Sequence, residues 1–232
     1  MIFRQWFDAD SSTYTYLLAD EASGQALLID AVRDQVERDL GQIREMGLEL
    51  VYVLDTHTHA DHVTAAGELR ARTHAKTVAG NKAAPCADMH LDDGGRLSLG
   101  EIEMHVIATP GHTNDSVSYR VGERVFTGDA LLIRAAGRTD FQNGSPYDLY
   151  DSITHKLFTL PDHTLVYPAH DYKGLTVTTI GEEKRFNARI ANRTREEFVR
   201  VMNGLNLPKP RLIDEAVPAN RACGVEPKLV QG

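Results

Sequence analysis

The sequence has few cysteines and no long apolar segment. Its 232 residues include two cysteines, Cys86 and Cys223, which lie far apart and outside any CxxC arrangement. This usage predicts neither a disulfide framework nor a zinc knuckle, and it favours a reducing compartment. No stretch approaches the roughly 18 uninterrupted apolar residues that a transmembrane helix needs, so we expect no membrane partner.

Positive charge is also scarce. The chain has 25 lysines and arginines against 33 aspartates and glutamates, a formal net charge of −8, and its basic residues form no block. Because nonspecific binding to nucleic acid depends on clustered cations, we expect no nucleic-acid partner. The start, "MIFRQWFDADSSTY", has neither the apolar segment of a secretory signal nor the arginines of a transit peptide, which favours a cytoplasmic protein.

The remaining composition is that of a globular protein, with 42% hydrophobic and 25% charged residues. The length suits one hydrophobic core. We therefore predict a single domain over residues 1–232, with a short extension of helices and loops from about residue 175.

Apolar patterns predict two successive runs of strands, each with helices. In the first half we expect a hairpin over 14–31, a helix over 34–46, a strand over 48–54, a helix within 63–73 and a strand over 76–80. In the first of these helices Val36, Leu40 and Ile43 fall at helical spacing. In the second half we expect paired strands over 96–112, a hairpin over 116–130 with Gly122 in its turn, and a strand over 164–171.

Capping residues predict two further helices in the second half. Ser145 and Pro146 have the N-cap and first-turn positions of one helix, and Thr194 and Glu197 have capping-box spacing before another. The Pro-rich residues 206–232 show no period and are predicted to be a loop or tail. Two sheets with helices outside them predict an αββα sandwich.

Metal-binding side chains follow four of the apolar strands, in "VLDTHTHADH", "VIATPGHTND", "VFTGDAL" and "LVYPAHDY". Imidazole and carboxylate suit zinc, iron or manganese, provided that several of them converge. Strand ends at one edge of a sandwich lie close together, so we expect one cleft to contain His57, His59, Asp61, His62, His112, Asp129 and His170. Seven such side chains suffice for two metal ions with Asp129 between them, which suits hydrolysis, and ligand number alone does not choose between one ion and two.

These motifs resemble a known family. "THTHADH", "TPGHT", "GDAL" and "YPAHD" are similar to the successive metal motifs of the metallo-β-lactamase superfamily. Within it, "LLIRAAGRTDFQNG", "YPAHDYKG" and "TVTTIGEEKRFNARI" closely resemble the persulfide dioxygenases, also called sulfur dioxygenases. The chain departs from the family pattern at Ala188, where proline is usual, and at Ala135 and Ala136, where Gly-Cys is frequent.

The resemblance implies one ferrous ion per chain, bound by His57, His112 and Asp129, in the 2-His-1-carboxylate arrangement of non-haem iron oxygenases. Four neighbours would orient the ligands by hydrogen bonds: His59, Asp61, His62 and His170. The implied reaction oxidises glutathione persulfide with O2 and water to sulfite and glutathione. We place Tyr172 and His170 among the catalytic residues, and the candidate substrate contacts are Arg138, Tyr172 and Arg189.

The main alternative is a dinuclear thioester hydrolase of the glyoxalase II type, with a protein that only binds metal as a more distant one. Glyoxalase II enzymes resemble this chain through the metal motifs, but they typically have a "GRFFEG"-like stretch where it has "GRTDFQ". They also carry a larger helical domain after the last motif histidine. A homodimer is common for such sandwiches, although the sequence does not fix the oligomeric state.

Overall fold

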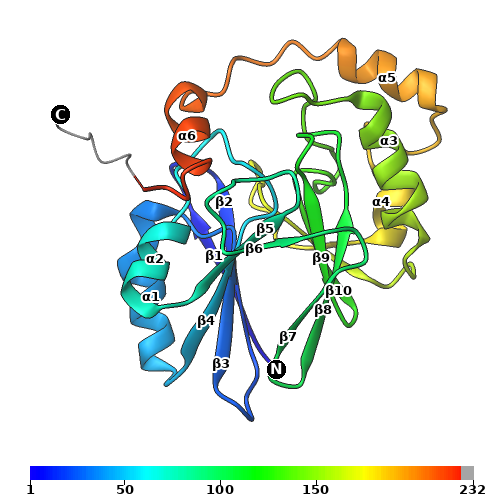
Figure 1. Cartoon of the computed structure of the whole chain (residues 1–232). Helices are drawn as coiled ribbons and strands as arrows, with labels where there is room; N and C mark the ends of the chain where they lie inside the picture. Colours follow the sequence, from blue (N-terminus) through cyan, green and yellow to red (C-terminus); the bar gives the residue numbers. More distant parts are fainter. Residues whose placement is uncertain (226–232) are drawn as a thin grey trace, which may run out of the picture.

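A computed structural model describes residues 1–225 and contains two six-stranded sheets (Figure 1). The strands of the first sheet lie in the order in which they occur in the chain. They are β1 (Ile2–Asp8), β2 (Thr13–Ala19), β3 (Gln25–Ile29), β4 (Glu49–Leu54), β5 (Lys76–Gly80) and β6 (Met89–Leu91). The pairs from β1 to β3 are antiparallel, and those from β3 to β6 are parallel.

The second sheet has the order β12-β11-β10-β9-β8-β7. Its strands are β7 (Arg96–Leu99), β8 (Ile102–Ala108), β9 (Val117–Val121), β10 (Arg124–Gly128), β11 (Leu165–Pro168) and β12 (Thr178–Thr179). Only the β10–β11 pair is parallel among them. The hairpin between β9 and β10 turns at Gly122, whose φ of 55° lies in the region that favours glycine, as the sequence predicts.

Helices cover the outer faces of both sheets (Figure 1). The first sheet is covered by α1 (Val36–Glu45) and α2 (Ala66–Thr73), and the second by α3 (Pro146–His155), α4 (Ile180–Phe186) and α5 (Arg195–Asn203). Short 3-10 turns, Arg33–Gln35 and Leu157–Thr159, precede α1 and follow α3. The predicted αββα sandwich is confirmed, and the capping residues before α3 and α5 also make their predicted hydrogen bonds.

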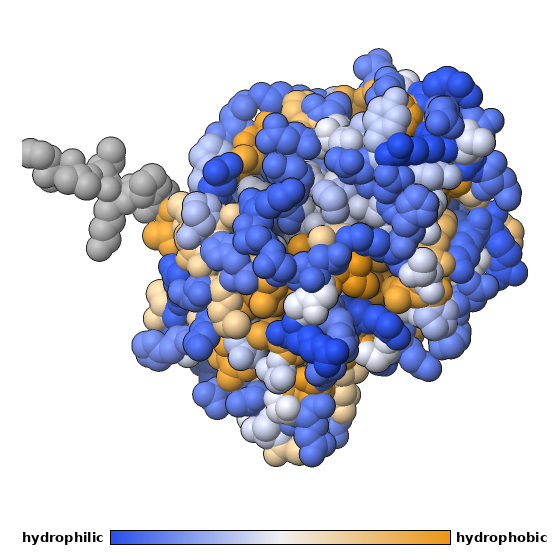
Figure 2. All heavy atoms as spheres, turned by 45° about the vertical axis from the view of Figure 1, so that its right-hand side comes forward, coloured by the Kyte–Doolittle hydropathy of each residue, from blue (hydrophilic) through white to orange (hydrophobic). Residues whose placement is uncertain are grey.

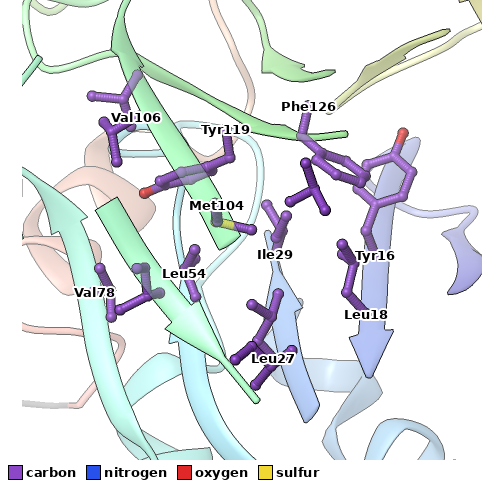
Figure 3. Close-up of a cluster of buried hydrophobic side chains, with 14 of the residues drawn as sticks. Tyr16, Leu18, Leu27, Ile29, Leu54, Val78, Met104, Val106, Tyr119 and Phe126 are labelled. Atoms are coloured by element: carbon purple, nitrogen blue, oxygen red, sulfur yellow. The ribbon is translucent and has the colours of Figure 1, made fainter. Parts of the chain in front are cut away.

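The central core lies between the two sheets (Figure 3). Strand β2 shows why both faces of the first sheet are apolar. Its Tyr16 and Leu18 point into the core, whereas Leu17 and Ala19 alternate to the outer face and pack with α1 and α2. Both faces of β2 are therefore buried.

The prediction of a loop or tail over 206–232 is wrong in part, because α6 (Ile213–Asn220) forms there; residues 226–232 lie outside the described part of the chain. Pro218 lies within this helix, where it removes one N–H donor. Tertiary packing compensates, since Ala216 and Asn220 are both buried against the rest of the protein. Local composition therefore misled the sequence-based interpretation.

The prediction that the cysteines do not pair is also wrong. Cys86 and Cys223 form a disulfide across 137 residues, with their Cα atoms 5.8 Å apart. The end of α6 returns to α2, where the amide of Gly67 donates to the carbonyl of Cys223 at 2.8 Å, and this return brings the two thiols together. The cysteine-based argument for a reducing compartment therefore loses its basis.

None of the helices within 1–225 has both the length and the apolar character needed to cross a bilayer. The face shown in Figure 2 is largely hydrophilic, with smaller hydrophobic patches between the polar residues.

Candidate metal centre

The seven predicted metal-binding side chains do come together, at the ends of β4, β8, β10 and β11. They form two groups, in each of which the candidate ligand atoms lie within 4.8 Å of one another. One group contains His57, His112 and Asp129, and the other contains His59, Asp61, His62 and His170. The first group has the composition that the family resemblance implies for an iron site.

The orientation of His112 is set by a backbone carbonyl. Its Nδ1 lies 2.7 Å from the carbonyl oxygen of Arg138, and because that oxygen can only accept, Nδ1 carries the proton. The lone pair is therefore on Nε2, which lies 3.5 Å from Oδ2 of Asp129. This arrangement presents one imidazole nitrogen and one carboxylate oxygen to the same point.

A short relay sets the orientation of His57. The hydroxyl of Thr56 donates to Oδ2 of Asp30 at 2.9 Å, so its oxygen is free to accept from Nδ1 of His57 at 3.0 Å. Nε2 of His57 is then the unprotonated nitrogen. Burial, together with the neighbouring imidazoles of His59 and His112, lowers the pKa of His57 well below its usual value, which favours the neutral form that binds metals.

His170 lies between two carboxylates. Its Nδ1 is 2.7 Å from Oδ1 of Asp129, and its Nε2 is 2.9 Å from Oδ2 of Asp61. Burial alone would lower the pKa of His170, but the two carboxylates raise it well above its usual value. Conversely, burial would raise the pKa of Asp129, whereas His170, His112 and His57 hold it well below its usual range. Asp129 is therefore ionised.

His59 and His62 complete the second group. Nε2 of His59 lies 3.1 Å from Oδ1 of Asp30, and Nδ1 of His62 lies 2.8 Å from Oδ2 of Asp61. Burial opposes protonation of His59, but Asp30 and Asp61 raise its pKa to about 9. Nδ1 of His59 and Nε2 of His62 are buried and have no hydrogen-bond partner within residues 1–225.

Sequence reasoning missed three residues that hold this centre. Asp30 ends the hairpin after β3 and accepts from the backbone N–H of Thr56 at 2.7 Å, and its φ of 54° is a sign of local strain. Thr13 places its hydroxyl within 3.3 Å of Asp61, His62 and His170. The third is Asn220 of α6. Only Asp30 carried a signal in the sequence, a carboxylate directly after an apolar strand.

Asn220 joins the C-terminal helix to the metal motif. Its side-chain nitrogen donates to the carbonyls of His59 and His62, each at 2.9 Å, and its oxygen accepts from the amide of Thr64 at 2.8 Å. The side chain is buried, with 3% of the residue exposed. The backbone that carries the motif histidines is thus held from a distant part of the chain.

The three predicted substrate contacts differ in their exposure to solvent and in how many of their polar atoms already form hydrogen bonds within the protein. The guanidinium of Arg138 binds both oxygens of Asp140 at 2.7 Å and donates to the carbonyls of Leu207 and Pro208, so it braces its loop. Tyr172 is 71% exposed and stacks on His170, with ring centroids 6.1 Å apart. Arg189 is partly buried and donates to the carbonyl of Ala136.

Comparison with known proteins gives consistent matches. A model of the metallo-beta-lactamase superfamily matches residues 9–85 and 84–170. The chain is 47% identical to the mitochondrial persulfide dioxygenase ETHE1 of Bos taurus, over 97% of the chain and 90% of that protein. It is 30% identical to glyoxylase B2 of Dictyostelium discoideum, over 97% of the chain and 92% of that protein. The crystal structure of ETHE1 from Myxococcus xanthus superposes with a TM-score of 0.96 at 61% identity, covering 97% of the chain and all of that structure.

Proposed function

Because the chain belongs to the persulfide dioxygenase family of the metallo-β-lactamase superfamily, we propose that it oxidises a persulfide with O2. The proposed substrate is glutathione persulfide, which reacts with O2 and water to give sulfite and glutathione. The observation that carries this proposal is the group of His57, His112 and Asp129 within a chain of 47% identity to a persulfide dioxygenase.

The proposed cofactor is one ferrous ion per chain, held by His57, His112 and Asp129. Two imidazoles and one carboxylate are the ligand set of many non-haem iron oxygenases. The residues fit this role, because hydrogen bonds at Nδ1 leave Nε2 of both histidines available and Asp129 is ionised. When bound, ferrous iron supplies the redox chemistry through which O2 and a persulfide react.

The neighbouring side chains have supporting roles in this proposal. Nδ1 of His170 forms a hydrogen bond with the carboxylate of Asp129 and so orients it. Asp61 and Thr13 orient His170 in turn through its Nε2. The exposed hydroxyl of Tyr172 is available to the substrate, and Arg189 is the proposed contact for a substrate carboxylate. We propose that Arg138 acts through loop shape, because its donors are already engaged.

A dinuclear thioester hydrolase is the second candidate function. It is favoured by the second group of four side chains within 4.8 Å and by the two buried imidazole nitrogens there without partners in the described residues. Against it, both ring nitrogens of His170 already face carboxylates, and identity to the persulfide dioxygenase exceeds that to glyoxylase B2, 47% against 30%.

One paired assay tests the proposal. Protein purified without oxygen is analysed for metal, and oxygen uptake is then recorded on addition of glutathione persulfide. We expect about one iron per chain, as a 2-His-1-carboxylate site requires, together with oxygen uptake. About two metals per chain, with thioester hydrolysis and no oxygen uptake, would instead favour the dinuclear hydrolase.

A pair of variants tests the ligand assignment. Asp129→Ala should abolish iron binding because it removes the only carboxylate of the proposed ligand set. His59→Ala should retain much of the iron, since His59 lies in the second group. Equal loss of iron from both variants would contradict a single-ion site. The homodimer and the cytoplasmic location stay predictions.

A further inference from the structure

A polar pocket of about 130 Å³ lies beside the metal motif. Its wall combines the motif itself, the loop after β5, the loop after β8, the turn before α3 and helix α6. The residues that matter here are Thr58, Lys82, Asn114, Gln142, Asn143 and Arg221. Thr58 stands between His57 and His59 in the sequence, so the pocket borders the backbone of the metal motif.

Lys82, Arg221 and Asp115 give the pocket a formal charge of +1 (two cations and one carboxylate), although the whole chain has a net charge of −8. Lys82 and Arg221 are both exposed and line it from different elements, and neither forms an ion pair with any residue in the range 1–225. The carboxylate of Asp115 also lines the wall, but it already accepts from the amide and hydroxyl of Thr58 and from the hydroxyl of Thr113. Two cations without carboxylate partners in the described chain favour an anion in the pocket.

A strained turn forms one side of the pocket and is fixed to the metal motif. Gln142 and Asn143 have φ values of 50° and 56°, in a turn closed by the amide of Gly144 and the carbonyl of Phe141 at 2.8 Å. Consecutive left-handed residues other than glycine are costly and occur where the surroundings enforce them. Here the side chain of Gln142 donates to the carbonyl of Thr58 at 2.7 Å, which fixes the turn to the metal motif.

The disulfide holds the other side. Lys82 lies in the loop that contains Cys86, and Arg221 lies two residues before Cys223, so the Cys86–Cys223 bond limits how far the two cations can separate. A fixed separation reduces the ordering cost when both cations bind one anion.

We infer that this pocket binds one oxyanion or carboxylate group through Lys82 and Arg221. Two molecules of the proposed reaction carry this chemistry: the peptide persulfide, through a carboxylate of its glutathione part, and the product sulfite. Their assignment rests on the proposed function, whereas the anion site itself does not. The segments that line this pocket do not include those that carry Tyr172 and Arg189.

The test uses the iron-loaded protein and four single variants. Lys82→Met and Arg221→Met each remove one charge from the pocket, and their double variant removes both. Lys76→Met, at the far end of β5, and Arg200→Met, exposed on α5, are the matched controls. Isothermal titration with sodium sulfate measures anion binding without turnover, and steady-state oxygen uptake measures kcat and KM for glutathione persulfide and inhibition by sulfite.

We expect the double variant to bind sulfate about tenfold more weakly than the wild type, as loss of partly exposed charge-assisted bonds implies, with the controls unchanged. A rise in KM with kcat unchanged identifies the substrate carboxylate as the ligand. Weaker inhibition by sulfite with KM unchanged identifies the product. Equal sulfate affinity, KM and sulfite inhibition in all proteins would overturn the inference. Sulfate binding that depends on both cations, in a protein that takes up no oxygen, would refute the proposed function and leave the anion site standing.

Discussion

Replacing Asn220 with alanine should destabilise the protein strongly, although the residue lies far from the metal motif in sequence. The change removes three hydrogen bonds of 2.8 to 2.9 Å and leaves the Thr64 amide and the His59 and His62 carbonyls buried without their partner. At about 1 kcal/mol for each net bond, the free energy of unfolding should fall by about 3 kcal/mol. For a chain of this length, that corresponds to a decrease in Tm of about 6–12 °C.

Thermal and urea unfolding of the oxidised protein, followed by circular dichroism, measure this effect. The matched control is Asn203→Ala, at the exposed end of α5, which removes an asparagine without known buried partners in the described chain. The control should unfold at nearly the same temperature as the wild type. If Asn220→Ala were no less stable than Asn203→Ala, the proposed link between α6 and the metal motif would be refuted.

Three further changes test other parts of the structure. Asp30→Asn should weaken iron binding about 10- to 100-fold in a chelator competition, because asparagine keeps only one of the two oxygens that accept from the amide and the hydroxyl of Thr56. An unchanged affinity would contradict the relay. Dithiothreitol should lower the free energy of unfolding by about 5 kcal/mol, which is the loop-closure value for a bond across 137 residues. Cys86→Ala should abolish this effect of the reductant. A wild-type urea unfolding curve that is the same with and without reductant would argue against the Cys86–Cys223 bond. Burial raises the pKa of Asp39 to about 6, although the neighbouring Arg38 lowers it. The pKa in the folded protein therefore lies above that in the unfolded chain. The stability that Asp39 contributes at low pH is lost as the pH rises through about 6. Asp39→Asn should therefore gain about 2–3 kcal/mol over the wild type at pH 8 but little at pH 4, and a gain independent of pH would contradict this assignment.

Sequence alone predicted the features that depend on local pattern. The helix with Val36, Leu40 and Ile43 on one face, the turn at Gly122 and the capping box at Thr194 all follow from neighbouring residues, and all are present. The convergence of the metal-binding side chains was also predictable, because each follows an apolar strand and strand ends meet at one edge of a sheet.

Features that depend on distant packing were not predictable. Nothing near Asn220 in the sequence indicates that its amide reaches the metal motif, and a Pro-rich context suggested a loop instead. The pairing of Cys86 with Cys223 has the same cause, since separation along the chain says little about separation in space. Thr13 directly precedes the predicted hairpin and carried no signal, and only its burial beside Asp61 and His170 shows its contact with the centre.

The link through Asn220 has a consequence for how the protein is made. A ribosome synthesises the metal motif early, well before the chain has reached the second sheet. The backbone of the motif therefore lacks the hydrogen bonds of Asn220 until α6 has been synthesised, and α6 follows every strand of both sheets in the sequence. A nascent chain halted before α6 has His57, His112 and Asp129 but lacks the side chain that binds the carbonyls of His59 and His62. The hydrogen bonds of Asn220 to the metal motif can therefore form only when synthesis of the chain is nearly complete.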